Sequence, residues 1–387
     1  MLQPLYSWWH TRALPTAAQE AYRRDACGLA HAQDPGLDAC IDAATDWLCQ
    51  AQDHSASQDG GVARDYSLQS GWASSYPETT GYIIPTMLAV AQLRRRDDLS
   101  ERAARMLDWC VRIQLPGGGF QGGRVDAQPV VPVTFNTGQI LLGLTAGVES
   151  FGRYHGAMHS AARFLRDSQD PDGCWRKHPT PFAAAGEKAY ETHVAWGLFA
   201  ADRIAPNEGY GAAGWRQVQW ALTKQQPNGW VRDCCLNRPD IPLTHTLGYY
   251  LKGLVEAHRW RPDEDLLAAA LLTAKGLAGA QRADGALPGR LTPQWRAAVS
   301  WSCLTGNVQI ADSWFYLGTT LNDATLLRAA RDANAFVRRT LLLTGDVGER
   351  GGIKGAFPVH GDYGRYEYLN WSAKFAIDAW LTERDLA

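Results

Sequence analysis

The sequence predicts an all-α protein, an (α/α)6 toroid of six helical hairpins in which outer helices surround inner ones. Three observations lead to this fold. A glycine-containing motif recurs six times along the 387 residues, an amphipathic stretch of helix length precedes each copy, and a more apolar stretch follows it. No segment carries a credible strand pattern.

The glycine motif ends the first helix of each repeat. Most copies begin with a glutamine at the helix end. Glycine follows within a few residues, and an aromatic residue often comes after the glycine. They are 58–61, 114–120, 169–175, 226–230, 281–287 and 351–357. Proline in these copies lacks an amide hydrogen and glycine tolerates positive φ, so each helix stops there.

The two sets of helices differ in polarity. The first helices carry a polar face, as Arg102, Arg105 and Asp108 do in the second repeat, which suits an outer ring with one solvated side. The second helices are apolar around most of their circumference, as helices packed on both sides must be. Each begins near a residue that can cap first-turn amides. These residues, spaced 54 to 63 positions apart, are Thr80, Thr137, Thr192, Thr246, Asn307 and Asn370.

We expect one toroid domain over residues 37–387, preceded by an N-terminal cap segment, 1–36, that wraps the ring. The connections from outer to inner helices are near twenty residues long, whereas returns such as 95–99 take only a few. Long loops in a compact domain generally bind or catalyse. All six should lie at one end of the toroid, over the N-termini of the inner helices, and we expect the functional face there.

The composition excludes several classes of protein. With 45% apolar and 20% charged residues the chain is globular, and a net charge of −2 gives no bulk attraction to nucleic acid. No apolar run reaches the roughly 20 residues of a membrane span, and the N-terminus lacks a secretory pattern. The eight cysteines lie in apolar helical segments, as reduced core thiols do, so we expect a cytoplasmic protein.

Several repeat motifs resemble those of known toroid proteins. Residues 169–175 look like the repeat motif of squalene-hopene cyclases, and 118–123 look like the glycine turn of protein prenyltransferase β subunits. Residues 76–82, 303–307 and 351–357 are similar to prenyltransferase-like proteins of bacterial exopolysaccharide regions. The resemblance implies the toroid and a role in polysaccharide biosynthesis. Uronate hydrolases, lyases and glucuronyl C5-epimerases share the fold, so it does not select a reaction.

Terpenoid chemistry would need motifs that this chain lacks. There is no Asp-x-Asp-Asp acid, and the nearest diphosphate-binding string, 97–101, falls at a short connection on the opposite face. A zinc site can be imagined from Cys234, Cys235, His245 and Cys303, but their spacing does not match a metal motif. We therefore predict neither a metal nor another cofactor.

The candidate catalytic residues lie at the predicted rim. His193 and His245 occupy equivalent places in adjacent repeats, where imidazole can carry protons near neutral pH. Glu78 and Glu191 stand at the starts of inner helices and supply two carboxyl groups. Two phenols complete the catalytic set as candidate partner acids, Tyr249 and Tyr366.

Binding groups are expected around these residues. Amides, charges and aromatic rings suit the hydroxyls, carboxylates and ring faces of sugars. The predicted binding residues are Arg232, Asp233, Asn136, Asn307, Asn370, Lys354, Trp301 and Tyr82, with Arg64 and Arg124 in the same loops. Helix capping explains the asparagines nearly as well.

Arginine, carboxylate and imidazole together favour a charged or polyhydroxylated ligand over a bare hydrocarbon. The sequence thus predicts a carbohydrate-active enzyme of polysaccharide biosynthesis or modification, acting on a glycan that contains uronic acid. Its reaction would be proton abstraction, as in an epimerase or lyase, or hydrolysis by two carboxyl groups. Two alternatives stay open: a terpenoid cyclase or prenyltransferase-like enzyme without the usual Asp-rich motifs, and a non-catalytic glycan-binding toroid. The expected partner is an oligosaccharide or a sugar-containing small molecule.

Overall fold

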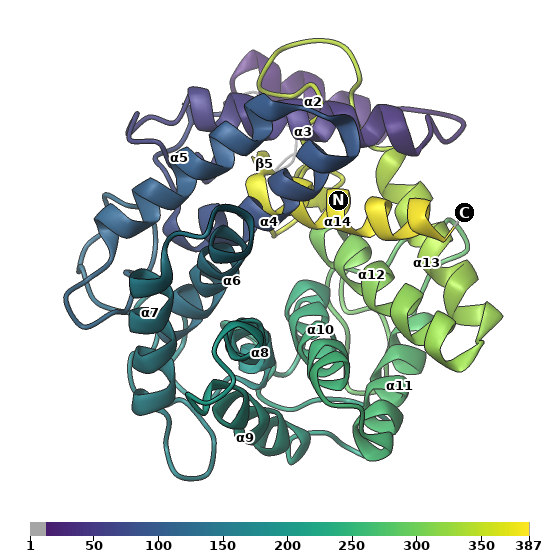
Figure 1. The fold of residues 1–387 in the computed structure, drawn as a ribbon. Helices are drawn as coiled ribbons and strands as arrows, with labels where there is room; N and C mark the ends of the chain where they lie inside the picture. The colour runs from purple at the N-terminus through teal and green to yellow at the C-terminus, as the bar shows by residue number, and fades with distance from the viewer. Residues whose placement is uncertain (1–12, 387) are drawn as a thin grey trace.

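The computed structural model describes residues 13–386. Its helical hairpins form a closed ring (Figure 1). The inner helices are α4 (Pro77–Arg94), α6 (Thr134–Phe151), α8 (Thr192–Ile204), α10 (Thr244–Trp260), α12 (Leu304–Leu321) and α14 (Asn370–Asp385). Each packs against the next inner helix, and α14 packs against α4, which closes the ring. The predicted (α/α)6 toroid is confirmed.

Each inner helix pairs with an outer helix. The outer ring comprises α3 (Leu37–Asp53), α5 (Asp97–Ile113), α7 (His155–Ser168), α9 (Tyr210–Leu222), α11 (Glu264–Gly279) and α13 (Ala324–Arg338). Consecutive helices pair as hairpins from α4–α5 to α12–α13, whereas α14 packs against α3. In Figure 1 this last pair joins the purple and yellow parts of the chain. The ring is therefore closed by elements from both ends of the sequence.

Burial follows the polarity of the two helix sets. In α5, Leu99 and Met106 are buried while Arg105 faces solvent. In α12, by contrast, every residue of 304–318 except Tyr316 is buried. Within the described part of the chain, no helix combines the length and apolar character needed to cross a membrane.

The recurring glutamine and glycine tie neighbouring outer helices together. In the fifth copy, Gln281 Nε2 donates to the Gly285 carbonyl of its own turn and to the Ala329 carbonyl of α13, both at 2.9 Å. Gln114 and Gln169 make the same pair of bonds in their repeats. Gly285 has a φ of +90°, and a Cβ there would lie 2.2 Å from a carbonyl oxygen of α13. Only glycine fits this contact, which is why the motif repeats.

The segment before α3 is anchored to the last long loop. It contains α2 (Thr16–Ala26), whose Asp25 is buried and pairs with the Lys354 ammonium group at 2.5 Å. Asp25 also accepts a hydrogen bond from the Val359 amide at 2.7 Å. Residues 1–12 of the expected cap lie outside the described part of the chain.

The long connections contain short strands that the sequence pattern did not predict. β1 (Asp65–Ser67) pairs with β2 (Gly71–Trp72) and with β5 (Glu367–Leu369), and β3 (Ser302–Cys303) pairs with β4 (Ala356–Phe357), all antiparallel. Two or three residues are too few for an alternating pattern to be recognised. These pairs link the last long loop to the first and to the fifth, and thereby join three of the long loops at the rim.

Candidate active site

A cavity of about 490 Å³ opens at this rim, over the N-termini of inner helices. Its lining includes four predicted site residues: Glu78 from α4, Asn136 from α6, and His245 and Tyr249 from α10. The aromatic side chains in the lining, besides Tyr249, are Tyr76, Phe135, Phe182, Tyr190, Tyr363 and Trp371. The cavity thus combines ionisable groups with aromatic walls, as small-molecule sites commonly do.

Glu78 is the single carboxylic acid among the described lining residues. It lies in the first turn of α4, directly after Pro77, and is half-buried. Burial raises the pKa of Glu78 to about 8, although hydrogen bonding with Tyr76 and the charge of Arg64 both lower it. The carboxyl group is therefore mostly protonated at pH 7 and can act as an acid.

His245 presents a neutral imidazole to the same cavity. Its Nδ1 lies 2.9 Å from the side-chain oxygen of Gln309 on α12. Because an amide oxygen only accepts hydrogen bonds, Nδ1 carries the proton, and Nε2 keeps a lone pair that no described residue hydrogen-bonds. Burial lowers the pKa of His245 to about 4, although the bond with Gln309 raises it. The ring can therefore accept a proton at Nε2.

Tyr249 packs between two histidines, with its ring centroid 4.3 Å from that of His245 and 4.5 Å from that of His193. His193 does not line the cavity. It is fully buried, with Nδ1 2.6 Å from the side-chain oxygen of Gln139 and Nε2 unpartnered among the described residues. Burial, reinforced by the Lys374 ammonium group, holds the pKa of His193 well below its usual range. The two histidines thus differ, and only His245 reaches the cavity.

Two arginines bring positive charge to the cavity. Arg64 pairs with Asp65 at 2.5 Å and with Glu367 at 3.0 Å. Arg124 is about half exposed and reaches Asp126 at 3.5 Å. None of these three carboxylates lines the cavity, and the one lining carboxyl group is mostly protonated. An anionic ligand would therefore meet guanidinium groups and no ionised lining carboxylate among the described residues.

Glu191 stands apart from the cavity. It ends the short 3-10 helix η1 (Ala189–Glu191) and is 6% exposed. Its Oε2 has no hydrogen-bond partner among the described residues. Burial raises the pKa of Glu191 to about 8, and the charge of Lys188 lowers it in part. The structure does not bring the two predicted carboxyl groups, Glu78 and Glu191, together in one cavity.

The three predicted asparagines have different surroundings. Asn136 lines the cavity, and its buried Nδ2 has no hydrogen-bond partner among the described residues. Asn307 accepts a hydrogen bond from the Leu287 amide at 2.8 Å, and Asn370 donates one to the Ala63 carbonyl at 2.8 Å. These last two hold the long loops onto the inner helices, so only Asn136 is placed to bind a ligand.

Four further predicted residues are buried and do not line the cavity: Tyr82, Tyr366, Trp301 and Lys354. Trp301 packs against Gly289, where a Cβ would lie 2.0 Å from the indole ring. Lys354 is held in its ion pair with Asp25. Buried hydrophobic or paired side chains of this kind stabilise the fold, which explains the place of Tyr82 in α4 and of the other three in the long loops without a ligand.

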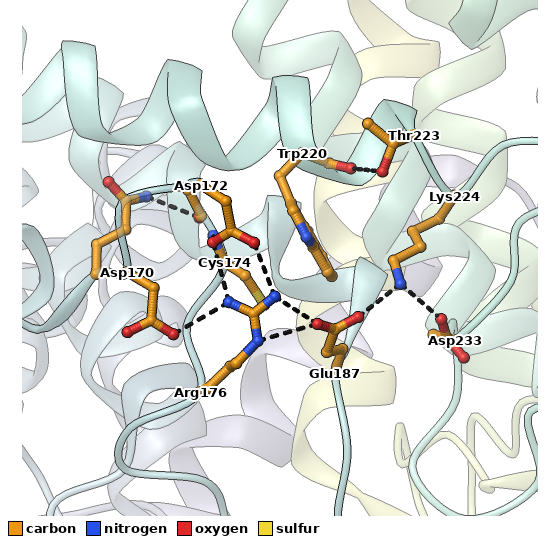
Figure 2. A network of polar contacts seen from close by, with 11 residues as sticks. Asp170, Asp172, Cys174, Arg176, Glu187, Trp220, Thr223, Lys224 and Asp233 are labelled. Atoms are coloured by element: carbon orange, nitrogen blue, oxygen red, sulfur yellow. Dashed lines mark hydrogen bonds and ion pairs between the residues drawn. The ribbon is translucent and has the colours of Figure 1, made fainter.

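Asp233, also predicted to bind substrate, belongs to a polar network (Figure 2). Its carboxylate pairs with Lys224 at 3.0 Å, Lys224 pairs with Glu187 at 2.6 Å, and Glu187 pairs with Arg176 at 2.5 Å. Its neighbour Arg232 is exposed to solvent. The network fastens two long loops to each other, and neither Asp233 nor Arg232 lines the cavity.

Sequence reasoning missed the lining residues Phe135, Phe182 and Trp371. A signal for two of them was present, because Phe135 and Trp371 are the second residues of their inner helices. Glu78 and His245 hold the same second position in α4 and α10. The same position holds His193 in α8 and Thr305 in α12, which do not line the cavity, so it narrows the search without identifying the lining residues. Phe182 lies in a loop outside the helical repeat, so no spacing marks it.

The cysteines near His245 are buried thiols. Burial raises the pKa of Cys303 to about 11 and raises that of Cys234 well above its usual range. All eight cysteines are free. Over residues 13–386, no three His, Cys, Asp or Glu side chains are grouped so that they could hold a metal ion.

No protein-family model matches this sequence, and none of the curated proteins is significantly similar to it. Solved structures are similar in fold. An unsaturated glucuronyl hydrolase specific for heparin matches 90% of this chain and 97% of its own, with a TM-score of 0.73 and 14% identity. A D-mannose isomerase matches 91% and 97%, with a TM-score of 0.71 and 11% identity. Cellobiose 2-epimerase from Bacillus thermoamylovorans B4167 matches 94% and 98%, with a TM-score of 0.68 and 10% identity. These likenesses establish that the chain has the α/α-toroid fold of these proteins.

Proposed function

We propose that this chain is a carbohydrate-active enzyme of polysaccharide biosynthesis or modification. It moves a proton at a sugar carbon beside a carboxylate, as an epimerase or lyase of uronic-acid-containing glycans does. His245 is the base, and Glu78 or Tyr249 is the acid. We place this activity in the cytoplasm, as the sequence pattern predicts.

One observation carries the proposal: two groups with opposite protonation line one cavity. Burial raises the pKa of Glu78 to about 8 and lowers that of His245 to about 4. At pH 7 Glu78 is therefore mostly a protonated acid and His245 a neutral base. Environments that push two pKa values apart are how enzymes assign an acid and a base within one site.

The reaction follows from these roles. His245 Nε2 takes the proton from the carbon α to the carboxylate, and the electron pair moves into the carboxylate to give an enediolate. In an epimerase, Glu78 or Tyr249 returns a proton to the opposite face of that carbon. In a lyase, the bond from the β carbon to oxygen breaks instead, and the acid protonates the leaving oxygen. Arg64 and the unpartnered amide of Asn136 can stabilise the enediolate charge.

The likeness in fold supports a sugar ligand. The three similar structures are named as a glucuronyl hydrolase, a mannose isomerase and a cellobiose epimerase, and all three names refer to carbohydrates. With identities of 10 to 14%, the support for this chain comes from the shared fold combined with its own cavity.

Hydrolysis is a second candidate, favoured by the likeness to the glucuronyl hydrolase. In this cavity it would depend on Glu78 alone, because Glu191 does not line it. A terpenoid ligand fits less well, since two arginines, a glutamic acid and a histidine line the cavity beside the aromatic rings. We therefore take the resemblance to squalene-hopene cyclases and prenyltransferases as one of repeat architecture.

The test incubates the purified protein with glucuronate-containing oligosaccharides in deuterated water. Wild type should place deuterium on the carbon beside the carboxylate or form an unsaturated product. His245→Gln should lower this rate by about 100-fold or more. His54→Gln changes an exposed histidine at the end of α3 and should keep the wild-type rate.

The products distinguish the candidates. Wild-type protein that yields neither deuterium incorporation nor an unsaturated product contradicts the proton-transfer reaction. Release of a saturated uronic acid without deuterium at that carbon would favour hydrolysis. Sugar binding without any reaction, unchanged in His245→Gln, would favour the glycan-binding alternative.

A further inference from the structure

Phe182 exposes an aromatic ring at the edge of the cavity. Its exposed fraction is 51%, the largest of any bulky hydrophobic residue that the structure describes, yet it lines the cavity with Thr180 and Arg124. Covering an apolar ring removes it from water and is favourable, and exposed apolar surface beside a cavity is typical of ligand-binding grooves. A single exposed ring is ordinary at a surface, but Phe182 borders the cavity, where a bound ligand can cover it.

The ring of Phe182 rests on glycine. Gly123, on the neighbouring long loop, has a φ of +75°, and a Cβ there would lie 2.6 Å from Cε2 of Phe182. A Cβ on Gly122 would lie 3.7 Å from the same atom. The backbone of one long loop thus packs directly against an aromatic ring of the next loop.

The loop that carries Phe182 is closed at its base. Arg176 and Glu187, which flank it, pair at 2.5 Å, and Glu187 also pairs with Lys224 (Figure 2). Beyond the ring, the Ala184 amide donates to the side-chain oxygen of Asn237 at 2.8 Å. Phe182 is therefore held in place before any ligand arrives, which reduces the entropy lost on binding.

We propose that Phe182 is the platform for a second sugar ring, so the cavity prefers the end of an oligosaccharide to a single sugar. This inference rests on the proposed function. The terminal uronate lies at Glu78 and His245, and the apolar face of the next ring stacks on Phe182. Arg124, half exposed beside it, can bind hydroxyl or acidic groups of that second sugar.

The experiment measures affinity by calorimetry in the His245→Gln background, where turnover does not interfere. The two probes are D-glucuronic acid and cellobiouronic acid, a glucuronate–glucose disaccharide. The parent protein, which carries His245→Gln alone, should bind the disaccharide about fivefold more tightly than the single sugar. Adding Phe182→Ala should remove most of that ratio, whereas adding Phe182→Trp should keep it. The thermal unfolding temperature checks that each variant is folded.

The outcomes separate the two proposals. If both sugars bind but Phe182→Ala leaves the ratio of their affinities unchanged, the platform is refuted while the proposed function stands. If Phe182→Ala weakens both sugars equally, Phe182 does not select a second ring, and the inference again fails. If neither sugar binds the His245→Gln parent or the wild type, the uronate ligand itself is refuted, and the platform with it.

Discussion

Replacing Glu78 with glutamine should stabilise the protein relative to wild type increasingly as the pH rises from about 4.5 to about 8. An unfolded chain ionises this carboxyl group near its ordinary pKa of 4.5, whereas the folded protein holds the proton up to about 8. Between these values the unfolded wild type releases a proton that the folded form keeps, so rising pH favours unfolding. Because glutamine does not titrate, the unfolding free energy of the Glu78→Gln variant does not fall in this way as the pH rises.

The magnitude follows from the shift. The pKa rises from 4.5 to about 8, and each unit corresponds to about 1.4 kcal/mol, which gives about 5 kcal/mol as an upper limit. Glu78 is only half-buried and borders a cavity, so part of its hydration is retained in the folded state. We therefore expect the difference in unfolding free energy to change by about 2 to 3 kcal/mol over this pH range.

Urea unfolding of wild type and Glu78→Gln at several pH values measures this difference directly. Comparing the two proteins at each pH cancels the titration of the other buried groups. Glu101→Gln, at an exposed position on α5, is the matched control. If the difference in unfolding free energy between Glu78→Gln and wild type stays constant from about pH 4.5 to about 8, Glu78 ionises in the folded protein as it does in the unfolded chain. Glu78 could then not be the acid.

Three further outcomes are expected. Deuterium incorporation by wild type should fall below about pH 4, as His245 becomes protonated, and above about pH 8, as Glu78 ionises; a rate that stays at its pH 6 value both below pH 4 and above pH 8 would contradict both roles. Gly285→Ala should lower the unfolding free energy by about 3 kcal/mol because its Cβ meets a backbone carbonyl, whereas Gly156→Ala, which meets nothing within 4 Å, should leave it unchanged or raise it by up to about 1 kcal/mol. Lys354→Met should cost about 3 to 5 kcal/mol by leaving Asp25 buried and unpaired, and adding Asp25→Asn should recover part of this loss in denaturant unfolding.

The fold could be predicted from sequence because its repeat rests on local chemistry. In three repeats the glutamine at the outer-helix end makes two backbone bonds, and the glycine that follows meets a neighbouring carbonyl, so both residue types are required there at fixed positions. The difference in polarity between the two helix sets comes from packing on one side or on two. The short strands escaped prediction because two or three residues carry no period.

The candidate site could be predicted only in part, because sequence spacing locates the rim but not the direction of each side chain. His193 and His245 have the same place in their helices, and each packs against Tyr249 and bonds a glutamine, yet only His245 lines the cavity. Asn307 has the amide that a sugar site would use, but a loop amide occupies it. Such differences depend on contacts that spacing does not encode: Gln139 bonds His193 from another repeat, and Leu287 bonds Asn307 from the long loop of the same repeat.

The second position of the inner helices shows what sets the chemistry of this ring. Glu78 there faces the positive end of a helix dipole, whose effect of about 0.3 to 1 kcal/mol would lower its pKa by less than one unit. The pKa instead rises by about 3.5 units, from 4.5 to about 8, so burial among the side chains around the cavity outweighs the helix end. The proton-transfer site that we propose depends on residues at and around that position that differ between repeats, with Glu78 of α4 and His245 of α10 lining one cavity.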